Sequence, residues 1–297
     1  MLAALTLVSP DPAALNLAAD RASEAVSRAG AVVKDRVRLG PDALDLALEA
    51  DDLAPLRDVV NVALADLPVD VCLQAEAGRK KRLFIADMDS TMISCECLDE
   101  LADYAGLKAE IAAITERAMR GELAFEPALR ERVSRLKGLP LEDLERCYVD
   151  RVRLNPGART LVRTLAQHGV ETVLVSGGFE FFTSRVAAAA GFASHQGNRL
   201  LDDGAHLTGE VADPILGREA KLEALHLHAA RLGVDPSAAV AIGDGANDLA
   251  MIGAAGLGLA YRAKPVVAAE ADARIDHADL TAVLYFQGYA SDAFVRD

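Results

Sequence analysis

The most constraining feature of this sequence is an apolar run that ends in two aspartates one residue apart, Asp87 and Asp89. The run, residues 82–86, predicts a short buried strand, and the chain breaks directly after it. The two carboxylates therefore lie at the carboxyl end of a strand, where open α/β sheets bind their ligands. At about 4 Å apart they would repel by roughly 4 kcal/mol at an effective dielectric near 20, so they need a proton or a cation such as magnesium between them. Alone, the segment also fits a solvated turn.

Two further polar clusters follow other apolar runs. Ser176, Gly177 and Gly178 come after residues 171–175 and precede a stretch of helix-forming composition, residues 180–190. Unpaired backbone N–H groups at such a helix start can hold an anion such as phosphate. A plain helix cap is an equally good explanation of this cluster.

The second cluster runs from Gly243 to Asp248 and follows the apolar residues 238–242. Its glycines imitate part of a dinucleotide fingerprint, but Asp244 and Asp248 would repel a pyrophosphate. As oxygen ligands the same acids suit magnesium. Lys221 lies between the two clusters near the start of a helical pattern, where a lysine is usually a solvated surface charge.

Together these pieces give the chain a clear family resemblance. The double aspartate, the Ser-Gly-Gly-Phe segment, Lys221 and the Gly-Asp-Gly-Ala-Asn-Asp segment occur in the order typical of the haloacid dehalogenase superfamily. Within that superfamily the chain resembles the phosphoserine phosphatases, over roughly residues 81–288. The resemblance implies a doubly wound, mainly parallel α/β sheet with an inserted helical cap.

The resemblance also implies a mechanism and a cofactor, Mg²⁺. Asp87 would be the nucleophile that forms an aspartyl phosphate, and Asp89 the general acid and base. Asp87, the backbone carbonyl of Asp89 and Asp244 would ligate the metal, with Asp248 supporting them from behind. The remaining implied residues, which would bind the phosphoryl group, are Ser176, Gly177, Gly178, Lys221 and Asn247.

The implied substrate is O-phospho-L-serine, hydrolysed to serine and phosphate in the last step of serine biosynthesis. Helical periodicity at residues 98–107, 108–120, 127–136 and 141–148 predicts a cap, at about residues 98–152, over the catalytic face. In family register, Glu96 would pair with the ammonium of serine and Arg132 with its carboxylate, while Met119 and Phe125 would pack against the substrate. Their ordinary alternatives are surface charge and packing between helices.

The first 77 residues lie outside these motifs. Strand patterns at 3–8, 31–38, 43–49 and 69–74 and helix patterns at 12–28 and 53–67 predict a small α+β, ferredoxin-like unit. It resembles the ACT-type amino-acid-sensing domain, and its simplest role is dimerisation or stabilisation, so a homodimer is one expectation. Residues 78–297 would form the catalytic part, with the basic stretch 78–82 as a linker.

Composition excludes several other classes of function. A net charge of −14 over 297 residues argues against nucleic acid and anionic membranes as partners. No apolar stretch approaches the ~20 residues of a membrane helix, and the four cysteines form no disulfide framework. We therefore expect a cytoplasmic enzyme with a small-molecule substrate. The alternatives are a relative acting on another small phosphate ester and a non-catalytic amino-acid sensor.

Overall fold

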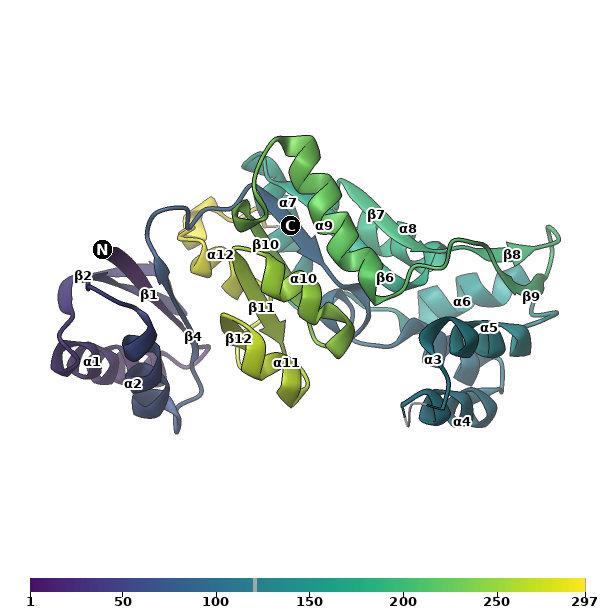
Figure 1. The fold of residues 1–297 in the computed structure, drawn as a ribbon, viewed down its shortest axis with the longest axis horizontal. Coiled ribbons are helices and arrows are strands. Elements are labelled where there is room, and N and C mark those ends of the chain that lie inside the picture. The colour runs from purple at the N-terminus through teal and green to yellow at the C-terminus, as the bar shows by residue number, and fades with distance from the viewer. Residues whose placement is uncertain (120–121, 297) are drawn as a thin grey trace.

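The computed structural model of the protein describes residues 1–119 and 122–296. These residues form three parts that follow one another along the long axis of the molecule: an N-terminal sheet with two helices, a central sheet, and a group of helices at the far end (Figure 1). The C-terminus returns to the central part.

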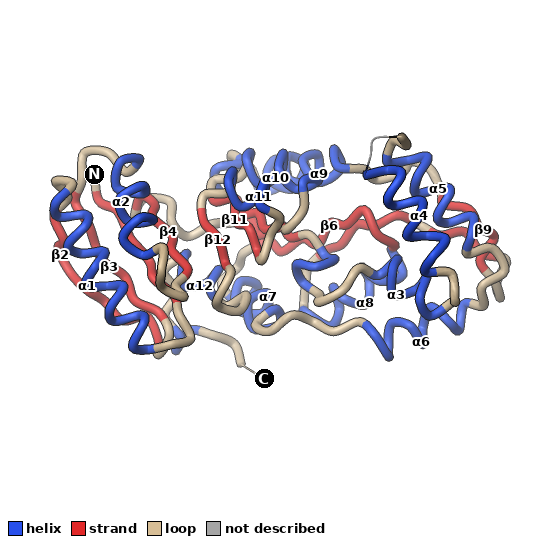
Figure 2. The backbone as a smooth tube through the Cα atoms, turned by 90° about the horizontal axis from the view of Figure 1, so that it is seen from below, coloured by secondary structure: helices blue, strands red, loops and turns tan. Residues whose placement is uncertain are grey.

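The N-terminal part is a four-stranded antiparallel sheet with strand order β2-β3-β1-β4. Its two helices pack on one face, as Figure 2 shows, over a core that includes Leu15, Val26 and Val60. Asp11 caps the first helix by accepting a hydrogen bond from the Ala13 N–H at 2.8 Å. The βαββαβ order confirms the predicted ferredoxin-like unit. Its elements are β1 (Leu2–Val8), α1 (Pro12–Arg28), β2 (Val32–Gly40), β3 (Ala43–Glu49), α2 (Ala54–Leu64) and β4 (Asp70–Ala75).

The central part is a six-stranded parallel sheet with strand order β12-β11-β10-β5-β6-β7. The chain starts at β5, builds outward through β6 and β7, and then returns to build the other side from β10. The strand order therefore reverses beside β5, which is where this class of sheet binds ligands. The strands are β5 (Leu83–Ala86), β6 (Glu171–Phe179), β7 (Ser194–Asn198), β10 (Ala239–Gly243), β11 (Leu257–Tyr261) and β12 (Ala273–Ile275).

Helices cover both faces of this sheet because its strands are apolar on both sides. In β5, Phe84 and Ala86 join the core on one face, and Leu83 and Ile85 join the core on the other. The first core contains residues of α7 (Ala158–Gln167), α8 (Glu180–Ala190) and α12 (Ala282–Phe286). The second contains residues of α9 (Arg218–Leu232) and α10 (Leu249–Ala254), and α11 (Pro265–Glu270) packs beside them. The doubly wound fold is confirmed.

Among the described residues between β5 and β6, four helices form the predicted cap: α3 (Cys97–Tyr104), α4 (Lys108–Met119), α5 (Phe125–Arg135) and α6 (Leu141–Arg151). Arg120, which we expected to end the second helix, lies outside the described residues. A hairpin that the sequence did not predict, β8 (Leu200–Asp202) with β9 (Leu207–Val211), joins this group. Leu207 donates to the Leu139 carbonyl at 2.9 Å and accepts from the Gly138 N–H at 2.8 Å, so two separate segments build the cap.

The free face of the N-terminal sheet packs on the central part through a buried ion pair. Arg79 and Asp45 are both 7% exposed, and the Arg79 guanidinium donates to both Asp45 carboxylate oxygens at 2.7 and 2.9 Å. It also donates to Thr6 Oγ1 and to the carbonyls of Tyr285 and Phe286. The basic stretch that we expected to be a linker is therefore part of a buried junction.

Strand β4 makes a second polar contact with the central part, through hydrogen bonds to backbone groups. The Asp70 carboxylate accepts hydrogen bonds from the backbone N–H groups of Asp276 and Ala278 at 2.8 and 2.7 Å. Gln74 donates to the Phe286 carbonyl at 2.7 Å. The division at residues 77 and 78 stays a prediction, with β4 ending before it and β5 beginning after it.

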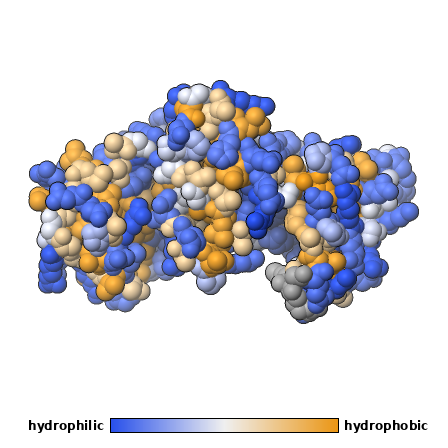
Figure 3. Space-filling view, in the orientation of Figure 1, coloured by the Kyte–Doolittle hydropathy of each residue, from blue (hydrophilic) through white to orange (hydrophobic). Residues whose placement is uncertain are grey.

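The described helices include none that is long and apolar enough to cross a membrane. The space-filling view shows hydrophobic and hydrophilic residues interspersed over the visible face (Figure 3). The apolar side chains most exposed to solvent include Leu2 and Val62 of the N-terminal part, at 63% and 79% exposure.

Replacing Arg79 with Ala should lower the free energy of unfolding by about 3–5 kcal/mol, because it leaves the buried Asp45 carboxylate without its partner. Urea unfolding followed by circular dichroism measures this change. Arg28→Ala is the matched control: it removes an exposed arginine that pairs with Glu24 on the same helix, and should cost no more than about 0.5 kcal/mol. Equal losses in the two variants would show that the junction contributes no special stability.

Candidate active site

The candidate site lies at the carboxyl edge of the central sheet, where β5, β6 and β10 end side by side. Asp87 directly follows β5, and its N–H donates to the Ile242 carbonyl of β10 at 3.0 Å. The turn Met88–Met92 then brings Asp89 back over this edge, with Ser90 in the left-handed region at φ +56°. Ser176 to Phe179 are the last residues of β6, which is therefore longer than we expected, and α8 begins at Glu180, as predicted.

A cavity of about 190 Å³ opens between this edge and the cap. It is lined by residues of the double-aspartate, Ser-Gly-Gly-Phe and Gly-Asp-Gly-Ala-Asn-Asp segments and of the cap. Of the predicted site residues, Lys221 and Asp248 are buried beneath the residues that line the cavity. The side chain of Met119 lies outside the described part of the chain. The lining residues are Asp87, Asp89, Glu96, Leu98, Phe125, Leu129, Arg132, Ser176, Gly177, Gly178, Phe179, Asp244, Gly245, Asn247 and Lys264.

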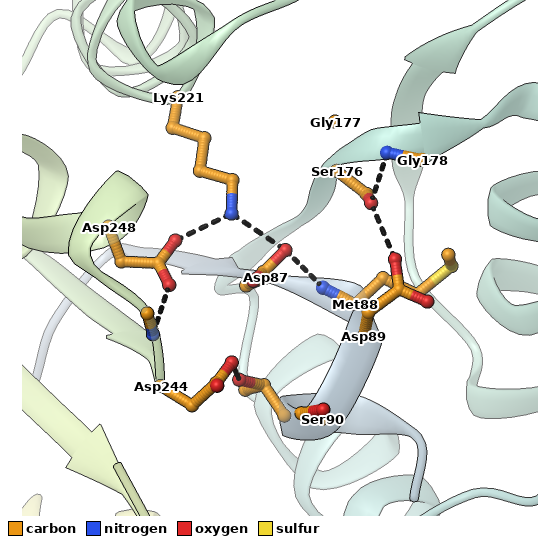
Figure 4. A network of polar contacts seen from close by, with 12 residues as sticks. Asp87, Met88, Asp89, Ser90, Ser176, Gly177, Gly178, Lys221, Asp244 and Asp248 are labelled. Atoms are coloured by element: carbon orange, nitrogen blue, oxygen red, sulfur yellow. Dashed lines mark hydrogen bonds and ion pairs between the residues drawn. The ribbon is translucent and has the colours of Figure 1, made fainter. Parts of the chain in front are cut away.

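Lys221 lies between Asp87 and Asp248, as Figure 4 shows, and its side chain is buried. Its ammonium lies 2.7 Å from Asp87 Oδ1 and 2.6 Å from Asp248 Oδ1. The second oxygen of Asp248 accepts the Gly245 N–H at 3.1 Å, so both oxygens of this fully buried carboxylate are paired. Lys221 is therefore no surface charge, and it links the segment that follows β5 to the one that follows β10.

Burial and charge determine the protonation of this group. Burial and the negative charge of Asp248 raise the pKa of Asp87, while Lys221 acts in the opposite direction. Burial alone would lower the pKa of Lys221, but the charges of Asp87 and Asp248 outweigh it and raise that pKa. The lysine is thus held in its charged form, and a further cation would favour the ionised form of Asp87.

Asp89 faces the end of β6. Its Oδ1 accepts the Cys97 N–H at 2.8 Å, and its Oδ2 accepts the Ser176 hydroxyl at 3.1 Å. The Gly178 N–H, expected to be an open anion donor, points to Ser176 Oγ at 2.8 Å. Burial, followed by the charge of Glu96, raises the pKa of Asp89 to about 6. A carboxyl with such a pKa can give and take a proton near neutral pH.

Three acids form a cluster with the geometry of a cation site. One carboxylate oxygen from each of Asp87, Asp244 and Asp248 lies within 4.8 Å of the others. Asp244 Oδ1 accepts the Thr91 hydroxyl at 3.2 Å, and burial, then the charge of Asp248, raises the pKa of Asp244. All the possible ligand atoms of this cluster are carboxylate oxygens, and their negative charges exceed the single positive charge of Lys221. The cluster therefore suits a hard divalent cation.

The cap contributes charged groups from above. Glu96 lies just before α3 and accepts the Ser90 hydroxyl at 2.7 Å. Arg132, in the last turn of α5, donates to the Ala128 carbonyl at 3.2 Å, and burial lowers its pKa while Asp99 and Glu96 oppose that change. Phe125 begins α5 and is 44% exposed at the mouth of the cavity.

Sequence reasoning missed several contributors to the site, among them Lys264 and the backbone N–H of Cys97. Lys264 lines the cavity next to Asp244, and no motif marked it. The Cys97 N–H orients Asp89, but a backbone donor leaves no trace in side-chain composition. For Lys264 the only available signal was its position just before Pro265, at the start of a helix after another sheet strand.

Comparison with known proteins identifies the class. The family model of haloacid dehalogenase-like hydrolases matches residues 84–253, which include both aspartate motifs, Ser176 and Lys221. The chain belongs to the haloacid dehalogenase-like hydrolases.

Within that family, the chain is similar over most of its length to phosphoserine phosphatases. One from Polaromonas sp. is 44% identical over 76% of this chain and 94% of its own length. Another, from Archaeoglobus fulgidus, is 42% identical over 77% of this chain and 67% of its own. The crystal structure of a probable phosphoserine phosphatase from Vibrio cholerae superimposes with a TM-score of 0.78 at 31% identity and covers 98% of this chain and 88% of its own. That match includes the N-terminal unit.

Replacing Gly243 with Ala should lower kcat at least about 100-fold, because the new Cβ would overlap the Asp248 carboxylate and displace the partner of Lys221. Circular dichroism should show that the fold is kept. Gly253→Ala is the matched control, since a Cβ there meets nothing within 4 Å and alanine is the better helix former. Unchanged kcat in Gly243→Ala would show that the position of Asp248 does not matter.

Proposed function

We propose that this enzyme hydrolyses O-phospho-L-serine to L-serine and phosphate. The observation that carries the proposal is one cavity that presents the Asp87 and Asp89 pair at its floor and the Glu96 and Arg132 pair at its cap side. The first pair suits phosphoryl transfer, and the second suits a zwitterionic amino acid. The similarity to phosphoserine phosphatases supports the same conclusion.

In this proposal Asp87 is the nucleophile. Its Oδ1 is engaged by Lys221 and by the Met88 N–H at 2.7 Å, and no residue of the described chain donates to Oδ2. Oδ2 forms a bond to phosphorus while the bond between phosphorus and the serine oxygen breaks. Water then attacks the phosphorus of the aspartyl phosphate and releases Asp87 and inorganic phosphate.

Asp89 moves the proton in both steps. Its raised pKa, about 6, allows it to protonate the departing serine oxygen. The resulting Asp89 carboxylate then takes a proton from the attacking water. Asp89 is therefore protonated again at the end of the cycle. Ser176 and the Cys97 N–H, which hold its two oxygens, set the direction in which that proton is delivered.

A magnesium ion fits the acidic cluster. Asp244 has one carboxylate oxygen that accepts no hydrogen bond from the described residues, and Asp87 contributes an oxygen to the acidic cluster, whereas both oxygens of Asp248 are already paired. We therefore assign Asp87, Asp244 and the Asp89 carbonyl as ligands, with Asp248 behind them. When bound, the ion would neutralise the charge that gathers around the phosphoryl group.

Recognition of the substrate rests on the cap. Glu96 is placed to pair with the ammonium of serine, and Arg132 with its carboxylate. Phe125 approaches the β6 edge so closely that a Cβ added at Gly177 would lie 3.3 Å from its ring, so the aromatic side chain covers the cavity. Ser176, Gly177, Gly178 and Asn247 would surround the phosphate.

Serine formation would make this reaction the last step of serine biosynthesis. The cytoplasmic location that we expect agrees with four cysteines that are all free thiols.

Phosphate release from a panel of phosphorylated amino acids and sugars tests the proposal. With Mg²⁺, phosphoserine should be the best substrate, and excess EDTA should abolish turnover until Mg²⁺ is added back. Asp87→Asn should lower kcat by at least about 10,000-fold, since the nucleophile is lost. A sugar phosphate as the preferred substrate, or full activity in EDTA, would contradict it.

Replacing Arg132 with Ala should raise KM for phosphoserine about 10- to 100-fold, the cost of losing a charge-assisted contact. KM for an aryl phosphate, which has no carboxylate at that place, should change little. Arg135→Ala, on the same helix but outside the cavity lining, is the matched control for cap stability. Equal effects of Arg132→Ala on both substrates would remove the basis for serine specificity.

A further inference from the structure

The cavity holds more negative than positive charge, although its proposed substrate is an anion. Its charged lining residues are four acids, Asp87, Asp89, Glu96 and Asp244, and two cations, Arg132 and Lys264. Phosphoserine carries about −2 on its phosphate at neutral pH, and its carboxylate and ammonium cancel. If Arg132 holds the carboxylate, Lys264 is the only lining cation of the described residues left for the phosphate.

The two lysines of the site differ in their availability. Lys221 is 1% exposed and lies between Asp87 and Asp248, so its charge is already shared by two carboxylates. Lys264 is exposed, and no carboxylate oxygen of residues 1–119 and 122–296 lies within 4.0 Å of its ammonium. An unpaired ammonium at the mouth of an acidic cavity is available to an incoming anion.

The backbone fixes where Lys264 stands. Its N–H donates to the Asp244 carbonyl at 3.0 Å, and its own carbonyl accepts the N–H groups of Val267 and Ala268 at 2.9 and 3.0 Å. The residue is thus tied to the Asp244 loop on one side and to helix α11 on the other. Its position is on the metal side of the cavity, away from the cap.

We propose that Lys264 is a phosphate-binding residue of this enzyme, which attracts the dianionic phosphate group to the mouth of the cavity and holds it on the side of Asp244 and Asn247. This inference rests on the proposed function, since it assigns one end of the same substrate. The Lys264 ammonium would make the cavity selective for dianions despite its acidic floor. It would also bind inorganic phosphate as this product leaves the cavity.

The test compares Lys264→Gln and Lys264→Arg with Arg262→Gln. Arg262 is two residues away and exposed, and its guanidinium lies over the Tyr261 ring, 5.2 Å from the ring centroid, outside the cavity lining. The control therefore removes the same charge from the same loop. Steady-state kinetics with phosphoserine at low and high ionic strength, and inhibition by inorganic phosphate, are measured for each variant.

We expect Lys264→Gln to lower kcat/KM about fivefold at low ionic strength, mainly through KM, and to raise the inhibition constant of phosphate by a similar factor. High salt should reduce the differences in kcat/KM and in the inhibition constant between Lys264→Gln and the native enzyme, because the Lys264 ammonium is exposed and screened by ions. Lys264→Arg should restore most of the loss, and Arg262→Gln should behave like the native enzyme.

Two outcomes would overturn the assignment. If Lys264→Gln leaves phosphate inhibition unchanged but raises the Mg²⁺ concentration needed for half-maximal activity, the lysine serves Asp244 and not the phosphate. If Arg262→Gln has the same effect as Lys264→Gln, only the general charge of the loop matters. Failure of the native enzyme to hydrolyse phosphoserine would contradict the proposed function itself, and titration of the native protein and the variants with inorganic phosphate would still test Lys264.

Discussion

The site depends on one buried cation, the Lys221 ammonium, held between Asp87 and Asp248. Three acids at one sheet edge repel one another, and burial makes that repulsion more costly. Lys221 offsets part of this repulsion and fixes Oδ1 of Asp87. Together with the Gly245 N–H, it pairs both carboxylate oxygens of Asp248. What remains is a floor with open oxygens on Asp87 and Asp244 and an excess of negative charge, which is the condition for binding a divalent cation.

The rest of the molecule keeps that edge in place. The parallel sheet reverses its order at β5, so three strand ends bring their motifs together without long loops. The cap covers them, and the hairpin β8 and β9 ties the cap to the chain that leads into α9 and Lys221. On the opposite side, the Arg79 and Asp45 pair joins the N-terminal sheet to the central part. The N-terminal unit is therefore packed against the catalytic part through buried polar contacts.

Much of this could be predicted from the sequence, because polar clusters that follow apolar strands must meet at one edge of a parallel sheet. The strand before Asp87, the ferredoxin-like unit and the cap helices all followed from periodicity and turn residues. Features that depend on distant partners could not be predicted. Arg79 looks like part of a solvated basic linker until Asp45 and the Phe286 carbonyl surround its guanidinium. Lys81 looks the same until its ammonium donates to the Ser237 carbonyl. The pairing of Lys221 with Asp248, the cap hairpin and the place of Lys264 are likewise products of tertiary contact.

The central claim is that Asp87 becomes esterified with phosphate while Lys221 and a divalent cation hold its surroundings. The most direct measurement is rapid acid quenching of the enzyme during turnover of phosphoserine, followed by peptide mass spectrometry. The account predicts a phosphate mass on the peptide that contains Asp87, absent from Asp87→Asn and from enzyme without Mg²⁺. Turnover at full rate with no phosphorylated Asp87 at any quench time, or phosphate on another residue, would contradict it.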